Sequence, residues 1–291
     1  MTRDRLLSSA VGIPLMILLI YFGGLRSWLG GALLVAVFAG VVYLAIHELL
    51  VALVAKGFRP EKEIVIGAGV LLVVAVWISE CQGGPTDAVV GVAAVVVTAA
   101  TLATKVFKSE IQNAVANVGS TVLGFVYVAG FLTYFLRLRL IDLPSAMGHP
   151  AAWSFLRECG ALLFVFLAAW MTDTGAWFFG RRFGRRPMSP VVSPKKTIEG
   201  GIAGVLTGTA FACLGAWCID LPLGHGLILG LLVGIVSQIG DLSESVLKRD
   251  LGIKDSSQII PGHGGVLDRF DSLLFAMPFS FYYLKLFVLG G

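Results

Sequence analysis

Acidic residues occur at three places in the second half of the chain where the neighbouring residues are strongly apolar. They are Asp173, Asp241 with Glu244, and Asp268 with Asp271. A carboxylate at mid-depth in a lipid bilayer costs about 2.5–3.5 kcal/mol on insertion scales, so it is expected to bind a partner there. Carboxylate oxygens suit Mg²⁺, which typically takes one or two of them together with water and substrate phosphates. We therefore predict that all of these acids except Asp173 are metal ligands.

The spacing after Asp241 places polar side chains on one face of a helix. Glu244, Ser245 and Lys248 follow it at i+3, i+4 and i+7. The two acids near residue 270 are also three residues apart and share a face. The alternative interpretation is that each acid only forms an ion pair with a neighbouring lysine or arginine at the membrane surface. Three acidic places next to many basic residues favour a metal–phosphate site.

The basic complement to these acids lies in the segment 181–199. It contains Ser193, Lys195, Lys196 and Thr197, directly before a predicted helix that begins at Thr197 to Gly200. The free N–H groups and the dipole of a helix start favour an anion, so we predict that these four residues bind phosphate. The four arginines earlier in the segment have a simpler explanation in membrane topology and anionic lipid headgroups.

A helix start, a basic pair and paired carboxylates together indicate phosphoryl or nucleotidyl transfer, where positioning and charge neutralisation provide most of the catalysis. No spacing indicates a Ser-His-Asp or Cys-His arrangement. The four cysteines form no CxxC pair, which argues against a zinc site or a disulfide framework. Three roles stay open for His263: orienting a phosphate, donating at a helix start, or a structural role. His47 and Glu48 are predicted to form an interfacial cap or ion pair.

The composition places this chemistry in a membrane. The chain has 291 residues, of which 57% are hydrophobic and 14% charged, whereas a soluble domain carries about 25% charged residues. We predict an all-α, polytopic membrane protein with about nine transmembrane helices and a polar site facing the cytoplasm. The predicted spans are 7–23, 28–46, 64–79, 88–104, 118–136, 160–180, 200–219, 224–241 and 272–289.

The arrangement of charged and small residues adds detail to this topology. With the N-terminus in the cytoplasm, only Arg26, Arg137, Arg139 and Arg157 fall in outer loops, as the positive-inside rule requires. Two sets of glycines spaced four residues apart predict close helix packing rather than a phosphate-binding loop. They are Gly200, Gly204 and Gly208, and Gly226, Gly230 and Gly234. We divide the chain into N-terminal membrane helices, 1–156, and a catalytic membrane region, 157–291.

At this point the polar segments resemble a known family. The segment from Ser245 to Asp271 reads Ser-x-Leu-Lys-Arg-x4-Lys-Asp and continues to Pro-Gly-His-Gly-Gly-x-x-Asp-Arg-x-Asp. This 27-residue pattern resembles the hallmark motif of the phosphatidate cytidylyltransferase (CDP-diacylglycerol synthase) family. The stretches 173–181 and 193–200 resemble two further family blocks, although Trp177 stands where tyrosine is expected. The first 150 residues resemble the family only in hydropathy and in the opening Arg-x-Arg-x-x-Ser-Ser-Ala stretch.

The resemblance implies an activity, cofactors and partners. Such enzymes transfer CMP from CTP to phosphatidate, giving CDP-diacylglycerol and diphosphate, with Mg²⁺ and a second, monovalent cation, K⁺. They resemble nine-helix homodimers, so we expect membrane lipids and a second copy as partners, no nucleic acid, and a location in the cell (inner) membrane. Asp241 and Asp268 match the metal-binding acids of the family.

The expected catalytic residues are Asp241, Asp268, Lys248 and Lys195. The expected substrate-binding residues are Asp173, Ser193, Lys195, Lys196, Thr197, Arg249, Lys254, His263 and Arg269. Two alternatives stay open: a cytidylyltransferase acting on another lipid phosphate, and, in a different class, a cation-coupled membrane transporter. The second is disfavoured because no inverted repeat is evident and the polar residues cluster at one membrane face.

Overall fold

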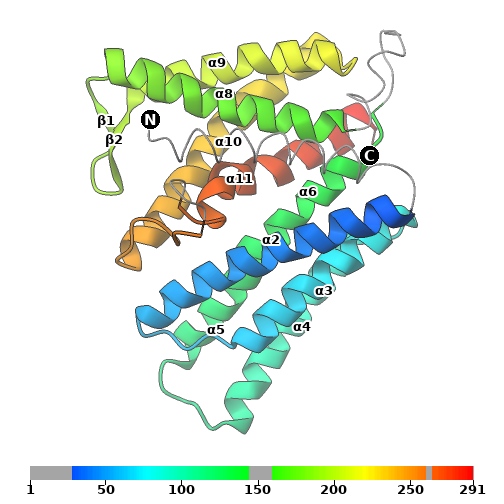
Figure 1. Cartoon of the computed structure of the whole chain (residues 1–291), viewed down its shortest axis with the longest axis vertical. Coiled ribbons are helices and arrows are strands. Elements are labelled where there is room, and N and C mark those ends of the chain that lie inside the picture. Colours follow the sequence, from blue (N-terminus) through cyan, green and yellow to red (C-terminus); the bar gives the residue numbers. More distant parts are fainter. Residues whose placement is uncertain (1–27, 144–158, 260–263, 291) are drawn as a thin grey trace. The chain divides into compact units, whose positions relative to one another are not determined.

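The computed structural model describes residues 28–143, 159–259 and 264–290. The first predicted span, 7–23, and the candidate residue His263 lie outside the described residues. Almost every apolar stretch within the described part forms a helix, as shown in Figure 1.

Seven helices of the described residues are long and apolar enough to cross a membrane. They are Gly30–Ala55, Lys62–Cys81, Thr86–Phe107, Ala114–Leu140, Gly160–Phe183, Ile198–Cys218 and Leu223–Asp250. Each corresponds to one predicted span, which confirms an α-helical, polytopic membrane protein. The last predicted span, 272–289, coincides with α11 (Leu267–Tyr283) and the π-helical turns of η3 (Leu284–Val288) that follow it. A total of nine spans stays a prediction.

The helices group into two compact units that do not follow the chain order. Unit 1 contains residues 1–137 and 250–269, and unit 2 contains residues 138–249 and 270–291. The described parts of the connection between α10 and α11, residues 251–259 and 264–266, therefore belong to unit 1, and we call them the signature loop. The division at residue 157 rested on where polar chemistry begins along the sequence, and it stays a prediction.

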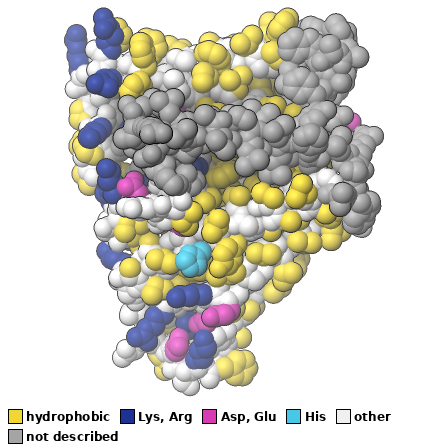
Figure 2. All heavy atoms as spheres, viewed as in Figure 1, with side chains coloured by type: hydrophobic (Ala, Val, Ile, Leu, Met, Phe, Trp, Pro, Cys, Tyr) yellow, Lys and Arg dark blue, Asp and Glu magenta, His cyan; other side chains and the backbone are white. Residues whose placement is uncertain are grey.

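Unit 1 is a cluster of apolar helices whose core is mostly hydrophobic. It contains α2 (Trp28–Ala55), α3 (Lys62–Cys81), α4 (Thr86–Phe107), α5 (Ala114–Leu123), the π-helical segment η1 (Gly124–Gly130) and the first part of α6 (Phe131–Leu140). Val42, Val73 and Val128 are fully buried, and Phe38 stacks on Phe135 with 4.4 Å between ring centroids. Hydrophobic side chains also cover much of the visible surface in Figure 2, as expected where helices face lipid.

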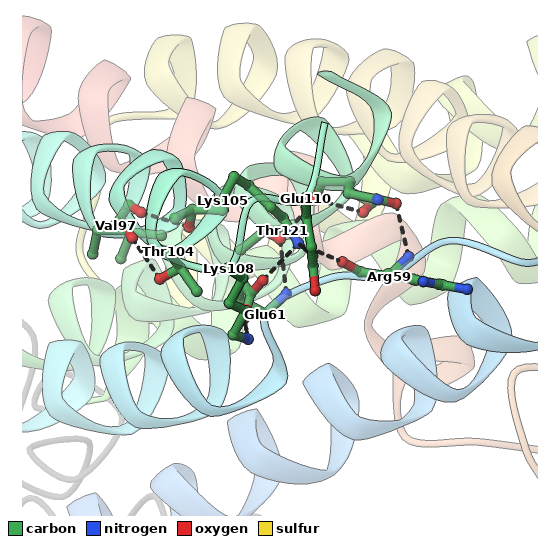
Figure 3. Close-up of polar contacts among 12 residues, drawn as sticks. Arg59, Glu61, Val97, Thr104, Lys105, Lys108, Glu110 and Thr121 are labelled. Atoms are coloured by element: carbon green, nitrogen blue, oxygen red, sulfur yellow. Dashed lines mark hydrogen bonds and ion pairs between the residues drawn. The ribbon is translucent and has the colours of Figure 1, made fainter. Parts of the chain in front are cut away.

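One end of unit 1 is held by a buried ionic cluster around Glu61, shown in Figure 3. Lys105 Nζ lies 2.6 Å from Glu61 Oε1, and Lys108 Nζ lies 2.9 Å from Glu61 Oε2. The Glu61 N–H donates to Thr121 Oγ1 at 3.0 Å. Burial acts to raise the pKa of Glu61, but the hydrogen bonds and charges of the two lysines outweigh it and lower the pKa below 4.5. The cluster ties the start of α3 to the end of α4 and to α5.

Unit 2 is built on the close packing of α8 (Gly160–Phe183) against α9 (Ile198–Cys218), which run side by side in Figure 1. A Cβ on Gly204 would lie 2.6 Å from the Thr172 carbonyl oxygen and 2.8 Å from Ala176 Cβ. In α10 (Leu223–Asp250), a Cβ added to Gly226 or to Gly230 would likewise lie 2.6 Å from the Cβ of an alanine in α9. These contacts confirm that both glycine sets serve helix packing rather than phosphate binding.

The local structure differs from the sequence prediction at two places. The segment before α9, for which no strand was predicted, is an antiparallel hairpin of β1 (Pro187–Ser189) and β2 (Ser193–Thr197). Helices α2 and α10 run nine residues beyond their predicted ends at 46 and 241, to Ala55 and Asp250. In α10 the extension is polar but still helical, because Glu244 and Lys248 pair at i, i+4 with 2.6 Å between Oε2 and Nζ.

Candidate functional site

Unit 2 contains a cavity of about 380 Å³ between the hairpin and the ends of its helices. The lining residues are Asp173, Ala176, Trp177, Gly180, Arg181, Met188, Lys195, Lys196, Thr197, Gly201 and Gln238. Four of the predicted site residues are among them: Asp173, Lys195, Lys196 and Thr197. The cavity therefore joins the acid of α8 to the basic pair, although these lie more than twenty residues apart in the chain.

The hairpin explains how both lysines reach the cavity. Strand β2 carries Lys195 and Lys196 directly into the start of α9, where Thr197 is the N-cap and its Oγ1 accepts a hydrogen bond from the Gly200 N–H at 3.2 Å. This cap satisfies one of the N–H groups that a helix start leaves free. Gly180 and Gly200 lack side chains where the helices meet beside this cap; a Cβ on Gly200 would lie 2.8 Å from Gly180 Cα.

Lys196 links the cavity to α10 through an ion pair with Asp241. The two side chains keep 30% and 25% of their surface exposed, so the pair is accessible to a ligand. Lys248, the lysine on the same helix face as Asp241, instead binds the buried Glu244. The sequence grouped these residues on one helix face, and the structure sorts them into two separate pairs.

Three carboxylates of unit 2 interact electrostatically near this pair. Asp241 and Asp271 both repel the charge of Asp173, and Lys196 opposes that repulsion. The Ser272 hydroxyl donates to Asp173 Oδ2 at 3.3 Å, and the Ser272 N–H donates to Asp271 Oδ1 at 2.5 Å. Within the described ranges, no three Asp, Glu, His or Cys side chains converge as a ready-made metal cage. A cation there would need ligands from a substrate as well.

The remaining predicted residues of unit 2 lie outside the cavity lining. Ser193 begins β2, and Arg249 Nε donates to the Val192 carbonyl in the hairpin at 3.3 Å. Glu199 accepts the backbone N–H groups of Arg185 and Arg186 at 3.0 and 3.1 Å. Those N–H groups, which could otherwise bind an anion, are thus already occupied by a carboxylate of the chain.

In unit 1, Asp268 is 8% exposed and organises the signature loop. Its Oδ2 accepts hydrogen bonds from the Ser256 N–H at 2.9 Å, the Ser256 hydroxyl at 2.9 Å and the Gly265 N–H at 2.8 Å. Gly264, which directly precedes Gly265, has φ +82°, which a residue with a side chain rarely adopts. The predicted substrate-binding residues Lys254 and Arg269 are exposed. The motif therefore includes residues that shape the loop as well as solvent-facing charges.

Sequence reasoning missed the role of Glu48. It was interpreted as an interfacial cap or pair at the end of a span, but it lies inside α2 and is 2% exposed. Its carboxylate binds the signature loop and the start of α11 (Leu267–Tyr283), more than 200 residues away. The available signal was the apolar run Leu49 to Ala55 after it, which indicates an acid within a helix rather than at its end.

The fold and this cavity place the chain among polytopic membrane proteins with a lysine-lined site suited to an anionic ligand. A model of the cytidylyltransferase family matches residues 3–287. The chain therefore belongs to the cytidylyltransferase family, which confirms the resemblance found in the motifs.

Several relatives bear the name phosphatidate cytidylyltransferase, and three of them show the extent of the similarity. One from Synechocystis sp. is 34% identical over 301 residues, covering 98% of this chain and 97% of the relative. One from Bacillus subtilis is 38% identical over 175 residues, 58% of this chain and 59% of the relative. One from Staphylococcus haemolyticus is 46% identical over 119 residues, 40% of this chain and 46% of the relative. The similarity to the first extends over the N-terminal helices, where motif reasoning found little.

Proposed function

We propose that the chain is a phosphatidate cytidylyltransferase, which converts CTP and phosphatidate into CDP-diacylglycerol and diphosphate. One observation of the structure carries the proposal: a cavity at the end of membrane helices is lined by Lys195 and Lys196, with Lys196 paired to Asp241. Two polyanionic substrates need cationic groups, and a lipid substrate needs a site that its headgroup can reach from the bilayer. The family membership supports the same assignment.

In this reaction an oxygen of the phosphatidate phosphate attacks the α-phosphorus of CTP. A phosphorus–oxygen bond forms to the lipid phosphate, the bond from the α-phosphorus to the bridging oxygen breaks, and diphosphate leaves. The attacking oxygen is already anionic at neutral pH, so a general base is not required. The main obstacle is repulsion between two anions, which preorganised positive groups reduce.

The residues of the chain would act mainly by holding and neutralising phosphates. Lys195 and Lys196 face the cavity together, and a substrate phosphate that displaces Asp241 from Lys196 would take over its ammonium group. Asp241 would then be free to bind a cation. Trp177 and Arg181, whose guanidinium lies 5.8 Å from the indole ring, line the same cavity and would help to exclude water.

The donor chemistry of unit 2 fits Mg²⁺, because Asp173, Asp241 and Asp271 repel one another and a cation would relieve that repulsion. Two carboxylates suffice when substrate phosphates complete the coordination. Asp241 and Asp271 would hold the Mg²⁺ ion in this unit. The other two metal ligands predicted from the sequence are Asp268 and Glu244. The family resemblance also implies K⁺ as a second cation. When bound, the metal would supply positive charge against the CTP phosphates.

The proposal includes a location and an assembly. The polar loops and the N-terminus would face the cytoplasm of the cell, where CTP is found, with the helices in the inner membrane. The acyl chains of phosphatidate would stay in the bilayer while the headgroup enters the cavity. As in the family, the working form would be a homodimer.

The test is conversion of labelled CTP by the purified protein, with the lipid product identified by mass spectrometry. We expect transfer to phosphatidate that stops when EDTA removes divalent cations and resumes with Mg²⁺. Asp241→Asn should abolish transfer. Glu63→Gln, which likewise replaces a carboxylate by an amide but at an exposed position of α3, should not alter it. If CMP were transferred faster to another lipid phosphate than to phosphatidate, that lipid would be the substrate instead. Normal turnover in Asp241→Asn would refute the metal assignment.

A further inference from the structure

We infer that Glu48 is a positioning residue for the transfer reaction: its buried carboxylate in α2 fixes the signature loop and, through it, Asp268. The inference rests on the proposed function for its kinetic consequence, while its structural consequence can be measured without any substrate. Glu48 lies outside all the motifs that carry the family resemblance.

The first support is the number of hydrogen bonds that one carboxylate receives. Oε1 accepts from the Ser257 hydroxyl at 2.6 Å and the Val266 N–H at 2.9 Å. Oε2 accepts from the Leu267 N–H at 2.8 Å and lies 3.1 Å from the Ser256 hydroxyl, whose single hydrogen it shares with Asp268. The donors are two serines within the signature loop, the last residue of that loop, and the first residue of α11. Glu48 therefore closes the loop and caps a helix from a distant part of the chain.

The second support is that the loop is shaped to receive this carboxylate. A Cβ on Gly265 would overlap Ser256 Oγ and lie 2.6 Å from Glu48 Oε2. Any larger residue at 265 would thus displace the carboxylate or the serine. The third glycine of the motif, Gly265, is explained by the space that Glu48 needs, which ties an unassigned residue to the hallmark pattern.

The third support is that Glu48 and Asp268 hold the same residues. The Ser256 hydroxyl oxygen lies 3.1 Å from Glu48 Oε2 and 2.9 Å from Asp268 Oδ2. The Gly265 N–H donates to Asp268, and the next N–H along the chain donates to Glu48. Because the two carboxylates accept hydrogen bonds from the same serine and from consecutive backbone N–H groups, loss of the Glu48 carboxylate would weaken the hydrogen bonds that orient Asp268.

A side chain with two acceptor oxygens suits this role because all of the partners of Glu48 can donate. A glutamine would keep one oxygen, but its NH₂ group would face either the pair at Oε1 or the pair at Oε2, donor against donor. Lys56, directly after the end of α2, binds Asp250, the last residue of α10, with 3.7 Å between Nζ and Oδ1. That ion pair contributes less than the buried hydrogen bonds of Glu48, since its two side chains are 44% and 67% exposed to solvent.

The experiment compares Glu48→Gln with the matched control Glu63→Gln in the purified full-length protein. The first readout is kcat and KM for CTP. Misplaced reacting groups lower the rate steeply, so we expect kcat of Glu48→Gln to fall by roughly a hundredfold with KM changed far less. The second readout is hydrogen–deuterium exchange without substrate. The Ser256 and Gly265 amides, which bind Asp268 rather than Glu48, should exchange faster in Glu48→Gln only.

The two readouts distinguish failure of the role of Glu48 from failure of the proposed function. Unchanged kcat together with unchanged exchange at Ser256 and Gly265 would overturn the inference. If the unaltered protein transfers no CMP, the proposed function fails, and the exchange measurement still decides whether Glu48 positions Asp268. If Glu48→Gln does not fold, Ser257→Ala removes a single donor to Oε1, and we expect a several-fold loss of kcat in the same direction. An unchanged kcat and unchanged exchange in Ser257→Ala would then count against the role.

Discussion

Replacing Lys196 separates the stability of the site from its activity. In Lys196→Gln the ion pair with Asp241 is lost, but both side chains are partly exposed, at 30% and 25%. Ion pairs of this kind contribute about 0.2–1 kcal/mol to stability. We therefore expect the melting temperature to fall by at most about 4 °C, using about 2–4 °C for each kcal/mol in a chain of 150–250 residues.

The effect of Lys196→Gln on the reaction should be much larger. A hydrogen bond to a charged group is worth about 1.5–3 kcal/mol when its partner is left without it. At 1.36 kcal/mol for each factor of ten, kcat/KM for CTP should fall by roughly ten- to two-hundredfold. Lys196→Arg keeps the charge and should recover part of the activity.

The assay measures lipid-linked CMP at several CTP concentrations and follows unfolding in detergent by intrinsic fluorescence. Lys62→Gln, at an exposed lysine at the start of α3, is the matched control and should resemble the unaltered protein in both measurements. If Lys196→Gln kept normal kcat/KM, the ammonium group would not contact substrate. A loss of more than about 10 °C with normal kinetics would make the pair structural, contrary to the exposure argument.

Three further predictions follow from the fold. Gly204→Ala should destabilise the chain by about 1–3 kcal/mol, because its Cβ meets a carbonyl of α8 at 2.6 Å, whereas Gly91→Ala, with nothing within 4 Å, should be neutral or stabilising in thermal unfolding. The lowered pKa of Glu61 means that its cluster stabilises the fold above about pH 4.5 and that this contribution is lost as the pH falls through the folded-state pKa; Glu61→Gln should therefore flatten the acid side of a stability–pH curve, and an unchanged curve would contradict the assignment. Thr197→Ala should cost about 1 kcal/mol through the lost N-cap, Thr197→Ser should restore it, and equal melting temperatures in all three proteins would show that the cap is dispensable.

The sequence predicted the membrane class and the positions of the helices because both depend on local composition. An apolar stretch of twenty residues needs an α-helix in lipid whatever its neighbours are. The helix ends were less predictable: α10 continues through Glu244 and Lys248 because side-chain pairs on its own surface stabilise it there. The glycine spacing was also reliable, since residues four apart share a helix face in any context.

The site was predicted only in part, because pairing depends on which segments meet. Asp173, Lys195 and Lys196 were recognised as site residues and do line one cavity. The sequence left open which lysine meets which acid, since the choice of Lys196 for Asp241 is made by the hairpin that precedes α9. That hairpin has no alternating apolar pattern, so no sequence signal marked it as strand.

The long separation between Glu48 and its donors has a consequence for how the chain is made. Leu267, one of its partners, is 219 residues further along, and at about 5–20 residues per second a ribosome needs roughly 10 to 45 s to reach it. Throughout that interval α2 carries a carboxylate whose native donors do not yet exist. The N-terminal helices can therefore enter the bilayer early but cannot complete their own core. A nascent chain interrupted before residue 256 would contain that acid without its serine and amide donors.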